Sequence, residues 1–265
     1  MKLPVGKARY GLMLREDGIV MDDGTTTRIS ENHYHMTTTT AQAANVLSHL
    51  EYYLQIVWPE LNVNVVSTTE QWAGAAIAGP KSRDMLSKLY PDLDVSNDAL
   101  PFMGYKEAEF FGVPSRIFRI SFSGELAYEI NVKSDHGMFM WEKMMEVGKE
   151  FGNQPYGTEA LSTLRIEMGH VAGPELDGRT IPSDVSLNGL VSKKKDFIGK
   201  NSLGREAFNV ESRQKIVGLI PIDRKSSIPE GSHIVQDQNA KLPNPKLGHV
   251  SSSCWSVENL SLIHI

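Results

Sequence analysis

The sequence predicts an α+β fold of several lobes with mostly antiparallel sheets, followed by a barrel-like β domain. Between about residues 60 and 170, short runs of alternating apolar and polar residues take turns with segments of helical period. From about Pro174 onward, Gly, Pro, Ser and Lys become frequent, and residues 214–253 alternate short apolar runs with turns. A chain of 265 residues suits two or three small lobes. We therefore expect domains at residues 1–173 and 174–256, with an atypical tail at residues 257–265.

Turn residues divide the first half of the chain into short elements. Arg15–Gly18 and Ser30–Asn32 are typical turn sequences, so they separate three strands. Pro59 ends the helix that follows, because proline cannot continue a helix. Gly79-Pro80 and Ser134 each precede a further helix. We expect strands at residues 8–14, 19–29, 33–39, 63–68, 73–78, 113–122 and 126–132. Besides the helices that follow Gly79-Pro80 and Ser134, we expect helices at residues 41–57 and 159–168.

Apolar residues at helical spacing indicate which face of each helix packs against a sheet. The third helix carries methionines in its stripe, which are more often core residues than cofactor contacts. The residues expected to face inward are Val46, Leu47, Leu50 and Leu54, then Met85, Leu86 and Leu89, then Met138, Trp141, Met145 and Phe151, and finally Leu161, Leu164 and Met168.

Composition and charge exclude several classes of protein. A net charge of −5 argues against general nucleic-acid binding, since no basic excess is available to neutralise phosphates. Lys193–Lys195 is the one basic run; it is either a solvated turn or a contact for an anionic tail. No apolar run approaches the ~20 residues that span a bilayer. The single cysteine, Cys254, rules out a disulfide within the chain, and no signal peptide is visible, so we expect a cytoplasmic protein.

The segment FRISFSGELAYEI, residues 118–130, is typical of a β-hairpin. Because side chains alternate along a strand, Tyr128 and Ile130 point to one face and Glu129 points to the other. A carboxylate on a strand beside a small residue can recognise a flat heterocycle that offers adjacent N–H donors. The alternative is that Glu129 is a solvated residue on a half-buried strand.

Asp22-Asp23-Gly24 has two interpretations, whereas Thr37–Thr40 has a structural one. Asp-Gly is a favoured hairpin turn, but turn signals already stand on both sides of it, so an acidic pair inside a strand is equally consistent. The threonines fit β-propensity and a helix N-cap. His33 and His35 could share a strand face, but no third ligand has supporting spacing, so we expect no metal site. The chain contains no G-x-G-x-x-G, P-loop or G-x-S-x-G sequence.

The hairpin resembles that of the folate-binding aminomethyltransferase family, which includes the T-protein of glycine cleavage. Over residues 5–254 the chain is more similar still to the α subunits of heterotetrameric sarcosine oxidases. The segments that carry this resemblance are RYGLMLREDGIVMDDGTTTRI, TTTTAQAANVLSHLEYYLQIVWPEL, TEQWAGAAIAGPKSR, PYGTEALSTLRIEMGHVAG and VSKKKDFIGK. The resemblance implies a T-protein-like fold. It also implies that part of the first lobe and the last strands of the family lie outside this sequence.

The resemblance assigns roles to single residues. Asp23 corresponds to the catalytic carboxylate beside the folate, with Asp22 next to it as a binding residue. Tyr10 corresponds to a tyrosine that lines the pterin pocket, and Glu129 to the glutamate that recognises the pterin ring. The other two binding positions differ from T-proteins, which carry Tyr where this chain has Phe122 and Asn where it has Thr39.

A further difference concerns the folate tail. T-proteins have an arginine where this chain has Leu161, so the resemblance leaves open how the tail is held. This difference also argues against a stand-alone T-protein that accepts a lipoyl-arm substrate.

The function implied is transfer of a one-carbon unit from the sarcosine-derived imine to tetrahydrofolate, giving 5,10-methylenetetrahydrofolate. The partners implied are a flavin-bearing β subunit and the other sarcosine oxidase subunits. FAD, FMN and NAD are expected only on other parts of that complex. The alternatives are a stand-alone aminomethyltransferase or demethylase of the T-protein family, and a folate-binding module without catalysis.

Overall fold

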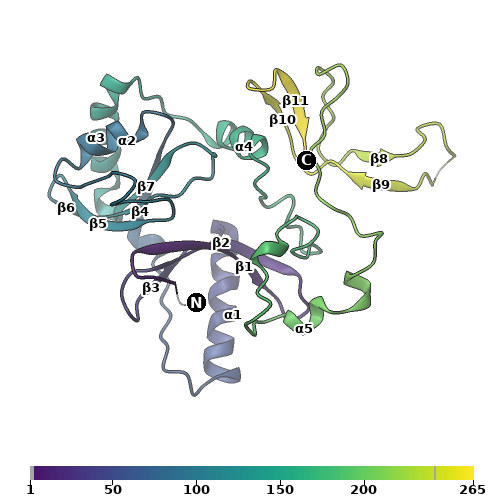
Figure 1. Cartoon of the computed structure of the whole chain (residues 1–265), viewed down its shortest axis with the longest axis horizontal. Coiled ribbons are helices and arrows are strands. Elements are labelled where there is room, and N and C mark those ends of the chain that lie inside the picture. The colour runs from purple at the N-terminus through teal and green to yellow at the C-terminus, as the bar shows by residue number, and fades with distance from the viewer. Residues whose placement is uncertain (1–2, 242) are drawn as a thin grey trace. The chain divides into compact units, whose positions relative to one another are not determined.

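The computed structural model describes residues 3–241 and 243–265, which form two compact units (Figure 1). The first unit contains Met1–Gly11 and Asp23–Tyr156, and the second contains Leu12–Asp22 and Gly157–Ile265. The strands β1 (Lys7–Leu14) and β2 (Val20–Arg28) therefore contribute residues to both units.

A four-stranded antiparallel sheet forms the centre of the first unit. Its strands follow the order β4-β7-β6-β5. Their bounds are Trp72–Ala78 for β4, Tyr105–Phe110 for β5, Val113–Phe118 for β6 and Ala127–Lys133 for β7. The predicted hairpin is confirmed, since β6 pairs with β7 with Phe118 opposite Glu129. The connection runs over residues 119–126 and is longer than expected, because β6 ends at Phe118 rather than at residue 122.

One strand expected in this unit does not form, and another strand forms that was not expected. Residues 63–68 form no strand, although they are rich in valine, because they are largely exposed and have no neighbouring strand. The strand β5 was not predicted from the sequence. Its segment YKEAEF is rich in charged residues, and it forms because it pairs along its whole length with β6.

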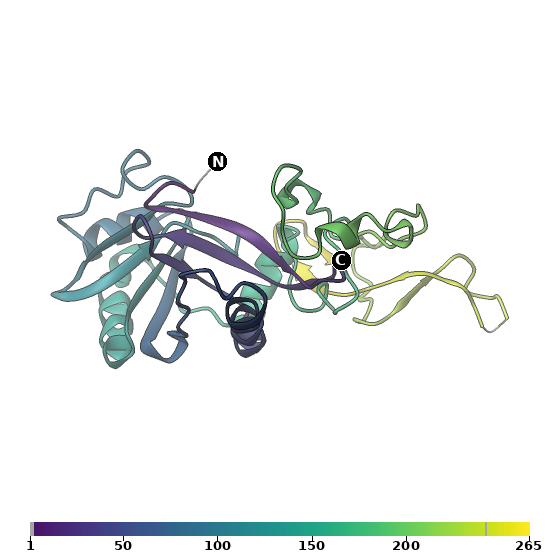
Figure 2. The same ribbon diagram turned by 90° about the horizontal axis from the view of Figure 1, so that it is seen from below.

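The core of this unit lies between one face of the sheet and two helices, α2 (Ser82–Leu89) and α3 (Gly137–Gly148). In Figure 2 the teal helix α3 lies against this side of the strands. The core side chains include Ile77, Met85, Leu86, Leu89, Phe110, Ile117, Tyr128, Ile130, Val132, Met140 and Met144. The predicted inward faces of α2 and β7 are thus confirmed.

The predicted face of α3 is wrong. Met140 and Met144 are buried, whereas Met138 is 70% and Trp141 46% exposed. The helix sequence GMFMWEKMMEVG has large apolar residues on almost every side, so spacing alone does not define which stripe packs.

The Asp-Asp-Gly sequence lies inside a strand. β2 continues through Asp22, Asp23 and Gly24, which excludes a hairpin turn there. A Cβ atom on Gly24 would lie 2.0 Å from the carbonyl oxygen of Thr37, so only glycine allows this approach. β3 (Tyr34–Met36) pairs with β2 and is shorter than predicted. The helix α1 (Ala43–Tyr52) follows a 3-10 turn at Thr40–Gln42 and continues as a π-helical turn at Tyr53–Val57.

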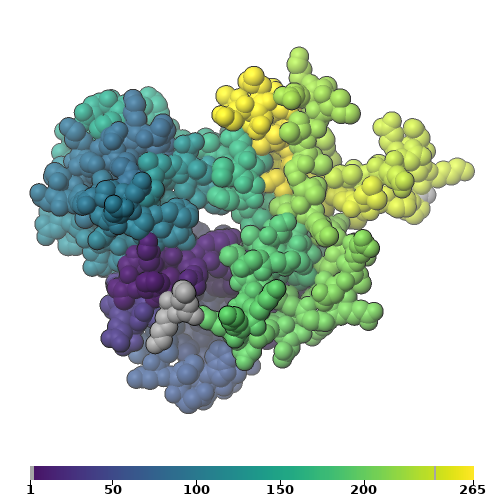
Figure 3. Space-filling model, viewed as in Figure 1, coloured from purple at the N-terminus to yellow at the C-terminus, as the bar shows by residue number. Residues whose placement is uncertain are grey.

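The second unit contains two separate two-stranded sheets, so the barrel-like domain expected for residues 174–256 is not confirmed. β8 (His233–Val235) pairs with β9 (Lys246–His249) in an arm that projects from this unit (Figures 1 and 3). β10 (Ser253–Ser256) pairs with β11 (Ser261–His264). The helices are α4 (Thr158–Glu167) and the short α5 (Lys200–Leu203).

The predicted inward face of α4 is also wrong. Arg165 and Ile166 are the buried residues of this helix, and Met168 at its end is exposed. Arg165 is inside because its guanidinium donates a 2.8 Å hydrogen bond to the Glu175 carboxylate and a 2.6 Å hydrogen bond to the Ser252 hydroxyl. A hydropathy pattern places arginine outside, so it misses a buried ion pair of this kind.

Candidate functional site

Tyr10 and Asp23 meet on neighbouring strands, β1 and β2, of the first unit. The Tyr10 hydroxyl donates a 2.7 Å hydrogen bond to Oδ2 of Asp23. The two residues lie 13 positions apart in the sequence, and the pairing of β1 with β2 brings them together. The hydrogen bond fixes the orientation of the carboxylate, and a carboxylate held in this way can accept a proton or stabilise a nearby cation.

Glu129 occupies the face of the sheet opposite to α2 and α3. Its cross-strand neighbours are Ala76 on β4 and Phe118 on β6. Burial raises the pKa of the Glu129 carboxyl above its usual range. The carboxylate makes no hydrogen bond or ion pair with the residues that the structure describes. A half-buried acceptor without a partner is available for the N–H groups of a ligand.

Tyr156 lies close to Glu129 and was not singled out from the sequence. Burial and, to a smaller extent, the negative charge of Glu129 raise the pKa of the Tyr156 hydroxyl. Tyr156 follows α3 in a segment without regular structure, so no periodic pattern connects it with the β7 strand.

The other three predicted site residues occupy different environments. Phe122 lies in the β6–β7 connection and is 41% exposed. Thr39 has an extended backbone and its carbonyl accepts the N–H of Gln42, so it stands at the N-cap of the 3-10 turn. Asp22 is buried and belongs to the second unit. The structure joins Tyr10 to Asp23 directly and places Phe122 and Glu129 in one hairpin.

His35, which the sequence offered as a possible ligand, packs against an aromatic ring. Its ring centroid lies 5.6 Å from that of Phe118. Burial lowers the pKa of His35, and the positive charge of Arg116 lowers it further. Among residues 3–241 and 243–265, no group of three or more His, Cys, Asp and Glu side chains could hold a metal ion.

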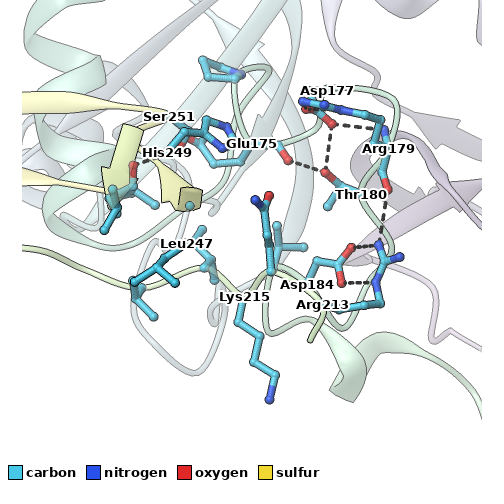
Figure 4. A pocket seen from close by; sticks show the side chains of 18 of the residues that line it. Glu175, Asp177, Arg179, Thr180, Asp184, Arg213, Lys215, Leu247, His249 and Ser251 are labelled. Carbon is cyan, nitrogen blue, oxygen red and sulfur yellow. Dashed lines mark hydrogen bonds and ion pairs between the residues drawn. The ribbon is translucent and has the colours of Figure 1, made fainter. Parts of the chain in front are cut away.

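A cavity of about 710 Å³ lies within the second unit and contains none of the predicted site residues. Figure 4 shows Asp184 facing Arg213, whose Nε donates a 2.8 Å hydrogen bond to the carboxylate. Asp177 forms an ion pair with Arg179, and Glu175 accepts a 2.8 Å hydrogen bond from Ser251. The carboxylates of this cavity are thus already bonded to other side chains.

No helix within the described part of the chain has the length and apolar character needed to cross a membrane.

Comparison with known proteins identifies the family. The model of the GCVT N-terminal domain matches residues 1–195. The chain belongs to the GCVT N-terminal domain family. The expected resemblance is therefore confirmed, and relatives of two kinds agree with it.

The first kind of relative of this GCVT-family chain is the sarcosine oxidase subunit alpha. The chain is 49% identical to that of Rhizobium meliloti (strain 1021) over 259 residues, which cover 97% of the chain and 26% of the relative. It is 46% identical to that of Corynebacterium sp. (strain P-1), over 95% of the chain. The chain thus spans about a quarter of the length of these relatives.

The second kind is the aminomethyltransferase. The chain is 31% identical to that of Caldanaerobacter subterraneus subsp. tengcongensis over 265 residues, which cover 99% of the chain and 68% of the relative. The crystal structure of glycine cleavage system aminomethyltransferase T from Bartonella henselae superposes with a TM-score of 0.80 over 99% of the chain and 68% of that protein. At 22% identity this superposition shows that the two share a fold, in agreement with the α+β, T-protein-like fold that the sequence predicts.

Proposed function

We propose that this chain is the tetrahydrofolate-binding, one-carbon-transfer part of a sarcosine oxidase α subunit. Its two substrates are tetrahydrofolate and the imine that forms when sarcosine is oxidised. Its products are glycine and 5,10-methylenetetrahydrofolate. The two nitrogens of tetrahydrofolate accept the imine methylene group, and their two hydrogens pass to glycine. The similarity to sarcosine oxidase α subunits over 97% of the chain supports this assignment.

The hydrogen bond between Tyr10 and Asp23 is the observation that carries the proposal. Transfer of the methylene group develops positive charge on a nitrogen and moves a proton. An oriented carboxylate can stabilise that charge and take that proton, which supports Asp23 as the catalytic residue. Much of the remaining rate gain comes from holding two reactants beside one another.

Glu129 supplies the recognition that a pterin requires. The pterin ring offers adjacent N–H donors at one edge, and an ionised carboxylate is a strong acceptor for them. Burial without a partner supports this role, since a solvated surface glutamate has no raised pKa. The small cross-strand neighbour Ala76 leaves room for a flat ring, and the aromatic side chain of Tyr156 lies beside the carboxylate.

The remaining assignments concern residues and partners around this pair. We assign Thr39 and Phe122 to the lining of the same site. The imine must come from elsewhere, because the chain has no dinucleotide-binding sequence. We therefore assign sarcosine oxidation to a flavin on a β subunit, FAD, FMN and NAD to other parts of the complex, and the complex to the cytoplasm.

A stand-alone aminomethyltransferase is the second candidate. Similarity to an aminomethyltransferase favours it, because the chain covers 68% of the length of that relative. The lower identity to that relative, and Leu161 in place of an arginine, favour the sarcosine oxidase assignment.

A coupled reaction tests the proposal. The purified chain is mixed with tetrahydrofolate and with an enzyme that oxidises sarcosine, and glycine and methylenetetrahydrofolate are measured together. We expect nearly one methylenetetrahydrofolate for each glycine formed, a higher ratio than in the same mixture without the chain, where the imine hydrolyses to glycine and formaldehyde. A yield equal to that of the uncatalysed mixture, together with no binding of tetrahydrofolate in a calorimetric titration, contradicts the proposal.

A further inference from the structure

Two cationic side chains meet at one aromatic ring in the sheet of the first unit. The guanidinium carbon of Arg116 lies 3.9 Å from the centroid of the Trp72 ring, and the ammonium nitrogen of Lys133 lies 4.4 Å from it. The three residues come from three strands, β6, β7 and β4. We call this group the Trp72 cluster.

The Trp72 cluster lies on the same face of the sheet as Glu129. On β7, Glu129, Asn131 and Lys133 are separated by two positions each, so their side chains point to one side. The strand register continues this face outward, because Trp72 pairs with Lys133 and Arg116 pairs with Asn131. The opposite face carries the fully buried Ile130 and Val132.

The two positive charges have no ion-pair partner among the described residues. Glu107 is the cross-strand partner of Arg116, and its carboxylate, which accepts a hydrogen bond from the Tyr105 hydroxyl, offsets part of the charge of Arg116, whereas no carboxylate of the described residues is paired with Lys133. The positive charge of Arg116 also acts on His35, whose pKa it helps to lower. Attraction to the ring only partly offsets the repulsion between the two cations, and a bound anion would relieve it.

We propose that the Trp72 cluster binds the carboxylates of the glutamyl tail of tetrahydrofolate. This inference rests on the proposed function, in which Glu129 holds the pterin. Four residues along a strand separate Glu129 from Lys133 by about 13 Å. The pterin ring and the p-aminobenzoyl-glutamate arm together cover at least this span, because the arm leaves the ring on the side opposite to the N–H edge that Glu129 would hold. A ligand lying along β7 would therefore place its anionic end at the two cations.

The surface between the two ends is low enough for such an arm. Gly74 and Ala76 on β4 are exposed and lie opposite Asn131 and Glu129. The side-chain amide of Asn131 lies beside Gly74, at ordinary contact distance from where a Cβ atom would be, so an arm on this strip would pass against that amide.

The tail preference of the chain tests this inference. Calorimetric titrations compare tetrahydrofolate triglutamate with 6-methyltetrahydropterin, which has the ring but no tail. For the double variant Arg116→Met, Lys133→Met we expect roughly tenfold weaker binding of the triglutamate, from the loss of one half-buried and one exposed charge pair, and unchanged binding of the tetrahydropterin. High salt should weaken triglutamate binding in the wild type and have little effect in the double variant.

Two further variants serve as controls. Lys106→Met removes one positive charge from the same sheet at β5, on the face that Ile117 shares, and should leave both affinities unchanged. Lys194→Met tests the exposed Lys193–Lys195 run in the second unit as a rival tail site. Loss of triglutamate binding in Lys194→Met, with none in the double variant, overturns the proposal.

Binding by the wild-type chain distinguishes failure of the tail site from failure of the proposed folate-binding function. If the wild type binds the tetrahydropterin and the triglutamate equally, the tail site is wrong and the folate assignment survives. If it binds neither, both are wrong.

Discussion

The Tyr10 hydroxyl donates a 2.7 Å hydrogen bond to the Asp23 carboxylate across two strands. This contact connects a hydroxyl that orients its neighbour with a carboxylate that can accept a proton. If it positions Asp23 for catalysis, its loss should affect the transfer step more than substrate binding.

Tyr10→Phe should lower the rate of methylenetetrahydrofolate formation about tenfold while keeping the KM for tetrahydrofolate within about twofold, because the ring stays and only the orienting hydrogen bond is lost. Steady-state kinetics of the complex containing the variant measure both constants. A rise in KM with an unchanged kcat would show that Tyr10 binds the folate rather than orients Asp23.

Glu129→Gln should weaken tetrahydrofolate binding by about 2–3 kcal/mol, because a donor would then face the donors of the ring. The fold should survive, since Tyr128 and Ile130 pack on the opposite face. Glu125→Gln, in the exposed part of the β6–β7 connection, is the matched control. Equal calorimetric affinities for the two variants would show that Glu129 is only a solvated residue of the strand.

The raised pKa of Glu129 also predicts how stability depends on pH. A carboxyl whose pKa is higher in the folded than in the unfolded state favours folding while it is protonated, and this contribution is lost as pH rises through the folded pKa. At neutral pH Glu129 therefore costs stability, and Glu129→Gln should unfold at a higher temperature than the wild type. The difference should shrink as the pH falls below the ordinary glutamate range. A difference that does not vary with pH would show that the carboxyl is unperturbed.

Removing one partner of the buried pair in the second unit should be strongly destabilising. The side chains of Arg165 and Glu175 are only 5% and 2% exposed. Glu175→Gln would leave a buried guanidinium without its counter-charge, which typically costs about 3–5 kcal/mol. Asp196→Asn removes one partner of an exposed pair with Lys200 and should cost less than about 1 kcal/mol. Urea unfolding of both variants provides the comparison.

The sequence predicts most of the fold and the neighbourhood of the site because both depend on local patterns. Alternation along residues 127–133 correctly places Glu129 opposite the buried face, and the turns on either side of Asp22–Gly24 keep that segment in a strand. β5 was missed because its strand character depends on pairing with β6. The packed face of α3 was missed because nearly every side of that helix is apolar. Tyr156 and the Trp72 cluster could not be predicted, since they depend on contacts between distant segments.

The fraction of the imine that is converted to methylenetetrahydrofolate in the assembled enzyme tests the role of Asp23 most directly. Asp23→Asn is compared with the wild type and with Asp135→Asn, an exposed control in the same unit, while sarcosine consumed and methylenetetrahydrofolate formed are both measured. We predict unchanged sarcosine oxidation and about 10²–10⁴-fold slower methylenetetrahydrofolate formation in Asp23→Asn alone, the usual cost of losing a positioned acid or base. An unchanged yield of methylenetetrahydrofolate in Asp23→Asn would contradict the account.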